Sequence, residues 1–165
     1  MDNVSANFNL SIALKGDNSD IVTADFGAAL DGLTTTRGVT FADGTGSDQV
    51  NVIYHDILPV STLEEIDFNG TTLKDAFGVG LELTKLKALF IKNLIGGLLT
   101  VGGASEPLDI FGTSASHVLE IVDNGQWFQT WPGDGLACAA SNGMLEFVHA
   151  VGGAQNIEIA AVGVR

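Results

Sequence analysis

The chain has 165 residues, 45% of them hydrophobic, and carries 20 acidic against 7 basic side chains, for a formal net charge of −13. The hydrophobic fraction excludes a disordered chain, and the length suits one domain, or one domain with an arm. The acidic charge argues against the clustered cations that bind nucleic acid phosphates or an anionic membrane surface. We therefore expect neither nucleic acid nor a membrane as partner.

No segment predicts a targeting signal or a membrane span. Asp2 stands where a signal peptide carries positive charge. The longest uncharged apolar stretch, 93–105, has 13 residues with four glycines, whereas a spanning helix needs about 20 apolar residues. The single cysteine, Cys138, excludes an intrachain disulfide and a multi-cysteine zinc site. We expect a soluble protein that is not exported by a classical signal.

Hydrophobic residues recur with a period of two along most of the chain, which is typical of half-buried strands. In chain order, the predicted strands are 8–14, 21–26, 38–42, 49–55, 63–68, 81–93, 98–101, 117–122, 126–131, 136–140, 144–151 and 155–164. Glycine-containing turns separate them at intervals of roughly 8–12 residues, which is typical of a sandwich or barrel. Asp123-Asn124-Gly125 has the sequence of a tight hairpin turn. The pattern predicts an all-β protein, an antiparallel β-sandwich resembling a jelly roll.

One short helix is predicted near residues 71–77 (TTLKDAF). This stretch begins with threonines that can cap a helix, and Gly78 stops it. The whole chain, 1–165, is predicted to form a single domain. Within it, residues 1–16 are a candidate N-terminal strand or arm that contacts a neighbouring subunit.

Charged side chains are unevenly distributed. Residues 1–69 hold 11 of the 20 acidic and two of the seven basic side chains, whereas 74–92 holds four basic ones. Lys85 and Lys87 are two apart in a predicted strand, so they would project from the same face. Such a basic ridge could dock on an acidic partner surface. The alternative is a solvent-exposed strand face whose lysines protect a sheet edge.

No catalytic motif occurs: the sequence lacks a nucleophile elbow, a metalloprotease helix motif and a phosphate-binding loop. His55, His117 and His149 fall in different predicted strands, and the adjacent His55 and Asp56 would point to opposite faces. The segment 43–48 resembles the start of a calcium loop, but the twelfth position of such a loop, which needs a glutamate, is Tyr54. These observations favour structural roles over catalysis or metal binding. We expect a non-enzymatic protein without catalytic residues, metal or cofactor.

Both tryptophans, Trp127 and Trp131, lie in the predicted strand 126–131 and share one of its faces. Two interpretations follow. The rings could pack in the core or against another subunit, or they could form a platform on which sugar rings stack. Phe128 makes the other face apolar too, which favours burial on both sides.

A series of stretches in fixed order carries a resemblance to a known family. They are 41–46 (FADGTG), 53–56 (IYHD), 66–68 (IDF), 73–78 (LKDAFG), 83–93 (LTKLKALFIKN), 101–104 (VGGA) and 157–163 (IEIAAVG). This series resembles small virion structural proteins of tailed bacteriophages, which are similar to head decoration, or cement, proteins. The resemblance runs from about residue 25 to the end of the chain. At 124–128 (NGQWF) the chain departs from the Gly-Gly turn and aliphatic strand of other members.

The resemblance implies a capsid decoration protein that binds the outer surface of the mature head and stabilises it by bridging major capsid subunits. The implied partners are the major capsid protein and further copies of the chain, as a homodimer or homotrimer on a symmetry axis. The implied location is the virion, after synthesis in the bacterial host cytoplasm. Alternatives are a tail or head-fibre part, or a carbohydrate-binding adsorption component. The candidate interface residues are Phe8, Leu10, Ile12, Lys85, Lys87, Trp127 and Trp131.

Overall fold

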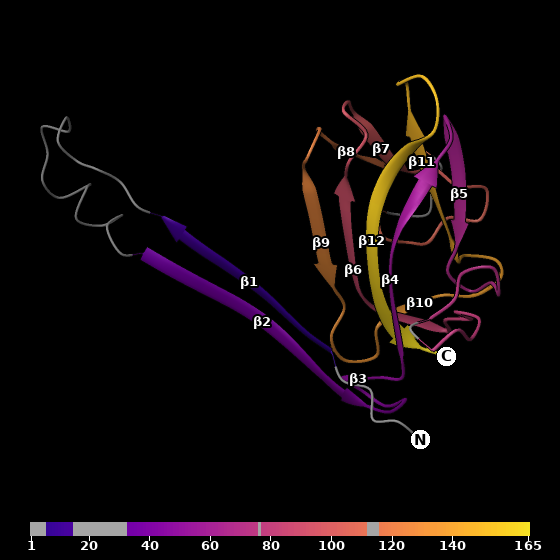
Figure 1. Cartoon of the computed structure of the whole chain (residues 1–165). Coiled ribbons are helices and arrows are strands. Elements are labelled where there is room, and N and C mark those ends of the chain that lie inside the picture. The colour runs from indigo at the N-terminus through magenta and orange to yellow at the C-terminus, as the bar shows by residue number, and fades with distance from the viewer. Residues whose placement is uncertain (1–5, 15–32, 76, 112–115) are drawn as a thin grey trace, which may run out of the picture. The chain divides into compact units, whose positions relative to one another are not determined.

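A computed structural model of the chain (Figure 1) describes residues 6–14, 33–75, 77–111 and 116–165. The chain divides into two compact units, one formed by Met1–Ala6 with Phe41–Arg165 and the other by Asn7–Thr40. Within the described residues every regular element is a strand, which confirms the all-β prediction. No helix in these ranges is long and apolar enough to cross a membrane.

The first two strands are β1 (Ala6–Leu14) and β2 (Leu33–Asp43), and they are neighbours in one sheet. The predicted strands 8–14 and 38–42 are thus confirmed, the second within a longer strand. The predicted strand 21–26 lies outside the described residues. The end of β2 pairs in parallel with β3 (Gln49–Val50), where Ala42 lies opposite Gln49.

Two antiparallel sheets form a β-sandwich within Phe41–Arg165 (Figure 1). What we call the first sheet contains β4 (Val52–Val60), β12 (Gln155–Val164) and β6 (Lys85–Asn93), with β9 (Gln126–Thr130) and β10 (Leu136–Ala137) both paired to the far edge of β6. The second sheet contains, in order, β5 (Leu63–Asp67), β11 (Met144–His149), β7 (Leu99–Gly102) and β8 (Val118–Ile121).

The core lies between these sheets and is built by alternation along their strands. In β11, Leu145, Phe147 and His149 are buried, and the residues that alternate with them are half-buried. The opposing first sheet contributes Leu89 and Ile91 from β6 and Ile159 from β12 to the same cluster. The period of two in the sequence therefore identified the faces that become the core.

The predicted short helix near 71–77 is not formed over the described residues 71–75 and 77. Asp75 instead closes a tight turn: its carboxylate accepts the N–H groups of Phe77 and Val79, each at 2.9 Å, and its own N–H donates to the Val79 carbonyl at 2.8 Å. An aspartate that bonds nearby backbone groups in this way competes with helix formation. Lys74 pairs with Gly80 in an isolated bridge across the turn.

The turn at Asp123-Asn124-Gly125 forms, but the hairpin predicted from it does not. The Gly125 N–H bonds the Val122 carbonyl at 2.8 Å, and Asn124 has a φ of 57°, as the turn requires. However, β8 pairs with β7 and β9 pairs with β6, so the turn joins the two sheets. A contact with another loop stabilises this turn: the Asp123 carboxylate accepts the Gly96 N–H at 3.1 Å. The sequence of the turn therefore does not determine whether it connects two paired strands or strands of two different sheets.

The predicted strand 81–93 begins only at Lys85. Glu82 has a φ of 41°, which breaks the extended backbone before that point. Leu81 and Leu83 are nevertheless fully buried, and the Leu83 N–H bonds the Phe68 carbonyl at 2.9 Å. The apolar alternation in the sequence thus covers both the strand and the packed loop that precedes it.

Candidate functional site

The predicted interface residues Phe8, Leu10 and Ile12 occupy alternate positions of β1, so the prediction that this segment is a strand is confirmed. Their side chains lie outside the described part of the structure. The strand addition expected of them therefore stays a prediction.

The predicted basic ridge of Lys85 and Lys87 is wrong, because Lys87 is buried. Its relative exposure is 1%, and its ammonium donates to the Gly133 carbonyl. Leu86 and Ala88 on either side are buried too, so both faces of β6 are covered here. Burial lowers the pKa of Lys87 and the charge of Lys85 lowers it further. Lys87 therefore stabilises the fold and does not present a charge to a partner.

Gly133 is held from a second direction by the loop that resembled part of a calcium site. The Asp48 carboxylate accepts the Gly133 N–H at 2.5 Å, and the Asp48 N–H donates to the Gly133 carbonyl at 3.0 Å. Gln49 closes the same loop by accepting the Gly46 N–H at 2.8 Å. The carboxylate of Asp48 therefore fixes two loops to one another.

Trp127 and Trp131 are brought together, and both pack against the core. Their ring centroids are 6.5 Å apart at an interplanar angle of 56°, and Phe111 adds a third ring 5.4 Å from Trp127. Both tryptophans are only partly exposed. A sugar platform needs an open ring face, so this geometry favours packing over sugar stacking.

A ladder of charges crosses three strands of the first sheet. His55 Nε2 in β4 lies 3.1 Å from one carboxylate oxygen of Glu158 in β12, and Lys92 Nζ in β6 lies 3.9 Å from the other. His55 thus pairs with Glu158, while Asp56 accepts the N–H of Ile57 at 2.8 Å. The ladder brings an imidazole and an ammonium group to one carboxylate.

The other histidines lie elsewhere. His149 in β11 is buried, and since a carbonyl only accepts, its Nε2 donates to the Val60 carbonyl at 3.1 Å. His117 is exposed just before β8. Over the described residues, no group of three or more histidine, cysteine, aspartate or glutamate side chains is placed to hold a metal ion.

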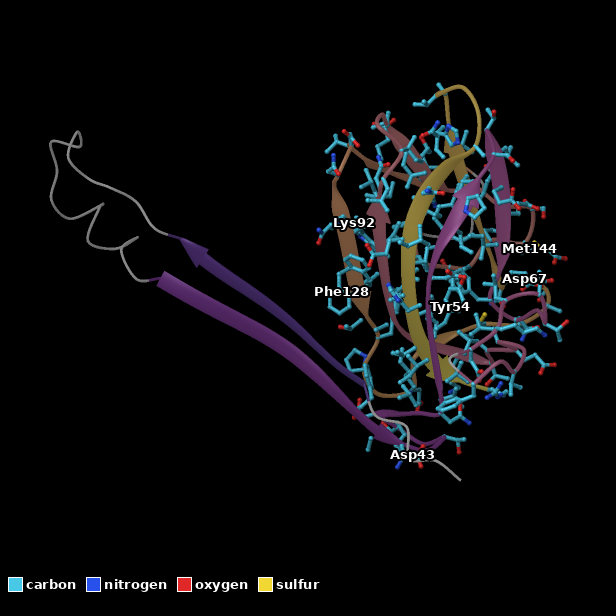
Figure 2. All side chains as sticks on the ribbon, viewed as in Figure 1. Asp43, Tyr54, Asp67, Lys92, Phe128 and Met144 are labelled. Carbon is cyan, nitrogen blue, oxygen red and sulfur yellow. The ribbon has the colours of Figure 1, made fainter. Side chains whose placement is uncertain are left out.

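Aromatic residues lie beside the ladder. The strand registers place Phe90 of β6 opposite both Ala160 of β12 and Phe128 of β9. We call the surface formed by these residues and the ladder the outer face; its full membership is His55, Ile57, Phe90, Lys92, Phe128, Glu158 and Ala160. Figure 2 labels Lys92 and Phe128 on the β9 side of the sandwich, and Asp67 and Met144 on the β5 side. The outer face combines half-buried rings with both signs of charge, as protein interfaces do.

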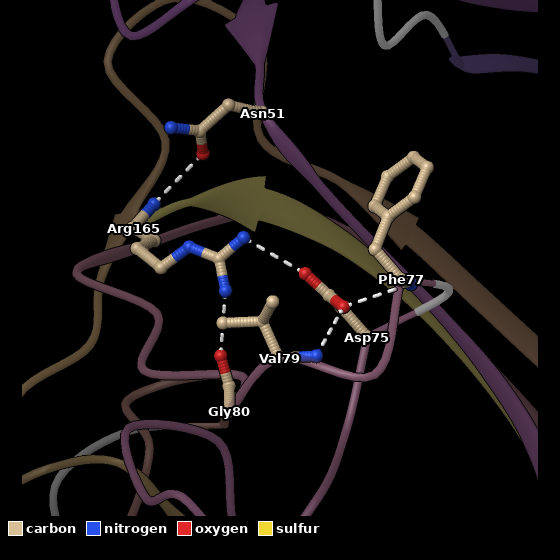
Figure 3. A network of polar contacts seen from close by, with 6 residues as sticks. All are labelled: Asn51, Asp75, Phe77, Val79, Gly80 and Arg165. Carbon is tan, nitrogen blue, oxygen red and sulfur yellow. Dashed lines mark hydrogen bonds and ion pairs between the residues drawn. The ribbon is translucent and has the colours of Figure 1, made fainter. Parts of the chain in front are cut away.

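Figure 3 shows a second polar network, which sequence reasoning missed. The Arg165 guanidinium lies 2.8 Å from the Asp75 carboxylate and also donates to the Gly80 carbonyl at 2.7 Å. The Arg165 N–H donates to the Asn51 side chain at 2.9 Å. Burial opposes ionisation of Asp75, but hydrogen bonds from Val79, Arg165 and Phe77 outweigh it and hold its pKa below the usual value. The network stabilises a loop and brings no reactive groups together.

Comparisons of the chain with family models, with curated proteins and with solved structures found no match.

Proposed function

We propose that the protein is a non-enzymatic structural protein of a tailed-bacteriophage virion, which decorates the outer surface of the mature capsid. Its partners are the major capsid protein and further copies of itself, as a homodimer or homotrimer. The observation that carries the proposal is the ordered series of stretches resembling virion decoration proteins.

The positions of these stretches support the proposal. The stretch 53–56 lies in β4, 83–93 includes β6, and 157–163 lies in β12. These three strands are hydrogen-bonded neighbours in the order β6, β12, β4. Segments far apart in the sequence therefore form one packed sheet. Three stretches that are far apart in the sequence and meet in one sheet favour a shared architecture over a chance match of short motifs.

The outer face is the surface of this sheet that we assign to the capsid. Ile57 is 51% exposed there, beside the ladder of His55, Glu158 and Lys92. Apolar contact would give affinity, and the ladder would pair with complementary charges and fix the register. A protein that binds only the assembled lattice adds its binding free energy to the mature state alone, at many sites on each particle.

A tail or head-fibre part is the alternative that shares the same sequence argument. Copy number separates the two roles, because a decoration protein covers the whole lattice. Quantitative mass spectrometry of virions should therefore find a copy number comparable to that of the major capsid protein. A handful of copies would assign the protein to the tail or a fibre.

Binding to the capsid is tested by co-sedimentation of the purified protein with mature heads lacking it. We expect Ile57→Glu to weaken this binding at least tenfold, because the exposed isoleucine is replaced by a charge. Val79→Glu is the matched control, since Val79 is similarly exposed at 48% outside the outer face. Wild-type protein that fails to sediment with heads would overturn the proposal.

A further inference from the structure

The β-sandwich has two open sides. Each side is formed by two edge strands, one from each sheet. On one side, residues of β4 and β5 line a groove of about 300 Å³. On the other side, residues of β8 and β9 line a groove of about 190 Å³. Among the described strands, β4 pairs only with β12, β5 only with β11, β8 only with β7, and β9 only with β6. Both sides therefore end in strands that an additional strand could extend.

The β4–β5 side carries the features that prevent such pairing. Pro59 in β4 has no N–H to donate. Asp56 and Glu64 occupy core-facing positions of β4 and β5, in step with Leu58 and Ile66, and both are exposed. Inward-pointing charges and proline are the usual means by which an edge strand is kept from pairing with another chain.

The β8–β9 side lacks these features. Residues 118–122 contain one charged side chain, Glu120, and residues 126–131 contain none. Val118 is 46% exposed and Val122 is 67% exposed. The apolar lining of the groove comes from Leu119, Ile121, Val122 and Trp127. On a protein of net charge −13, this side is a nearly uncharged, apolar edge.

We propose that a second copy of the chain covers this side, with β8 of each copy paired antiparallel about a two-fold axis. A two-fold contact places the same surface on both partners, so two copies of an acidic protein repel one another least where that surface carries little charge, and Glu120 is the one charged residue of β8. A basic partner would instead favour the β4–β5 side, where Glu64, Glu65 and Asp67 line the groove. Pairing through β8 would join the two second sheets into one and bury Val118 and Val122.

This pairing deepens the proposed function by naming the surface through which a homodimer forms, and it is tested on the protein in solution, whether or not a capsid is the target. Sedimentation equilibrium at high micromolar concentration should give twice the chain mass of 17.1 kDa. The double variant V118E/V122E should be monomeric, because each copy would bring two further charges into the contact. The matched control L63E/V79E changes two valine- or leucine-sized side chains of similar exposure, 55% and 48%, away from β8 and β9. It should remain dimeric. Circular dichroism and thermal unfolding of each variant check that it folds.

A spin label locates the contact without disturbing the apolar residues. In the dimer, a label on Glu120→Cys should show dipolar broadening from its mate, and a label on Glu64→Cys should show none. Cys138 will not compete, because it is buried and burial raises the pKa of its thiol to about 12. A monomeric wild-type protein, a dimer that survives V118E/V122E, or broadening at Glu64→Cys in place of Glu120→Cys would each overturn the proposal. A monomeric protein would not contradict the proposed binding to the capsid, because that binding is measured separately by co-sedimentation with mature heads.

Discussion

The Arg165 guanidinium lies 2.8 Å from the carboxylate of Asp75, whose side chain is fully buried. The pair connects the residue after β12 to the turn that replaces the predicted helix, and that turn is built on the same carboxylate. A single aspartate therefore holds two backbone N–H groups and one cation, and its loss should affect all three.

Asp75→Ala should destabilise the protein by about 3 kcal/mol, the usual cost of removing one partner from a buried ion pair. The variant leaves the N–H groups of Phe77 and Val79 without their acceptor. Arg165→Met should cost less, because Asp75 keeps both backbone donors. Urea unfolding measures the free energies, with exposed Asp109→Ala as the control expected to change little. Equal effects of the Asp75 and Asp109 variants would contradict the role assigned to the network.

The lowered pKa of Asp75 predicts an acid-dependent loss of stability. Because the folded protein binds this proton less readily than the unfolded chain, the stabilisation is present above the unfolded value of about 4 and is lost as pH falls through the lower folded pKa. Thermal unfolding between pH 6 and pH 2.5 should therefore show a smaller decline for Asp75→Asn than for the wild type. Parallel curves for the two proteins would show that this carboxyl does not contribute.

Glu146 and Glu65 lie directly opposite one another in β11 and β5. Burial raises the pKa of Glu146, and the charge of Glu65 raises it further. Glu146→Gln should therefore stabilise the protein at neutral pH by about 0.2–1 kcal/mol, the scale of a cross-strand pair. The gain should vanish in acid, where the Glu146 carboxyl is protonated. Glu64→Gln, which faces Phe147 across the same strands, is the control, and an equal gain there would refute the pairwise explanation.

Gly163 marks the irregularity in β12, where the register with β6 shifts between Val162 and Gly163. A Cβ at this position would lie 2.2 Å from the Lys85 carbonyl oxygen, so backbone would have to move. Gly163→Ala should destabilise the protein by about 1–3 kcal/mol. Gly152→Ala should be nearly neutral, because a Cβ on Gly152 would meet nothing within 4 Å. Thermal unfolding of the two variants tests this, and similar melting temperatures would be the contrary result.

Most strands could be predicted from the sequence because one face of each is buried. Alternation located β5, β11 and β12 to within two residues, whereas the predicted strand 49–55 covers β3 and only the first part of β4. It could not separate Leu81 and Leu83, which are buried in a loop, from the strand that follows them. Burial alone does not distinguish a strand from a packed loop, and the positive φ of Glu82 has no signature in the sequence.

The candidate site was harder to predict, because exposure depends on what covers a strand. Lys87 has apolar neighbours at Leu86 and Ala88, and such a run is typical of a strand buried on both faces. That signal could have excluded the basic ridge. The outer face could not have been found, because the pairing of His55 with Glu158 joins residues 103 positions apart.

The sequence by itself determined the all-β class, most strand positions, the acidic character and the turn at Asn124, because each depends on local composition or a period of two. Only the tertiary structure decided which strands share a sheet, that β8 and β9 belong to different sheets, and that Asp75 receives Arg165. These features depend on contacts between segments distant along the chain. Local propensity is the same whichever distant segment the chain meets, so only the packed core selects the partner.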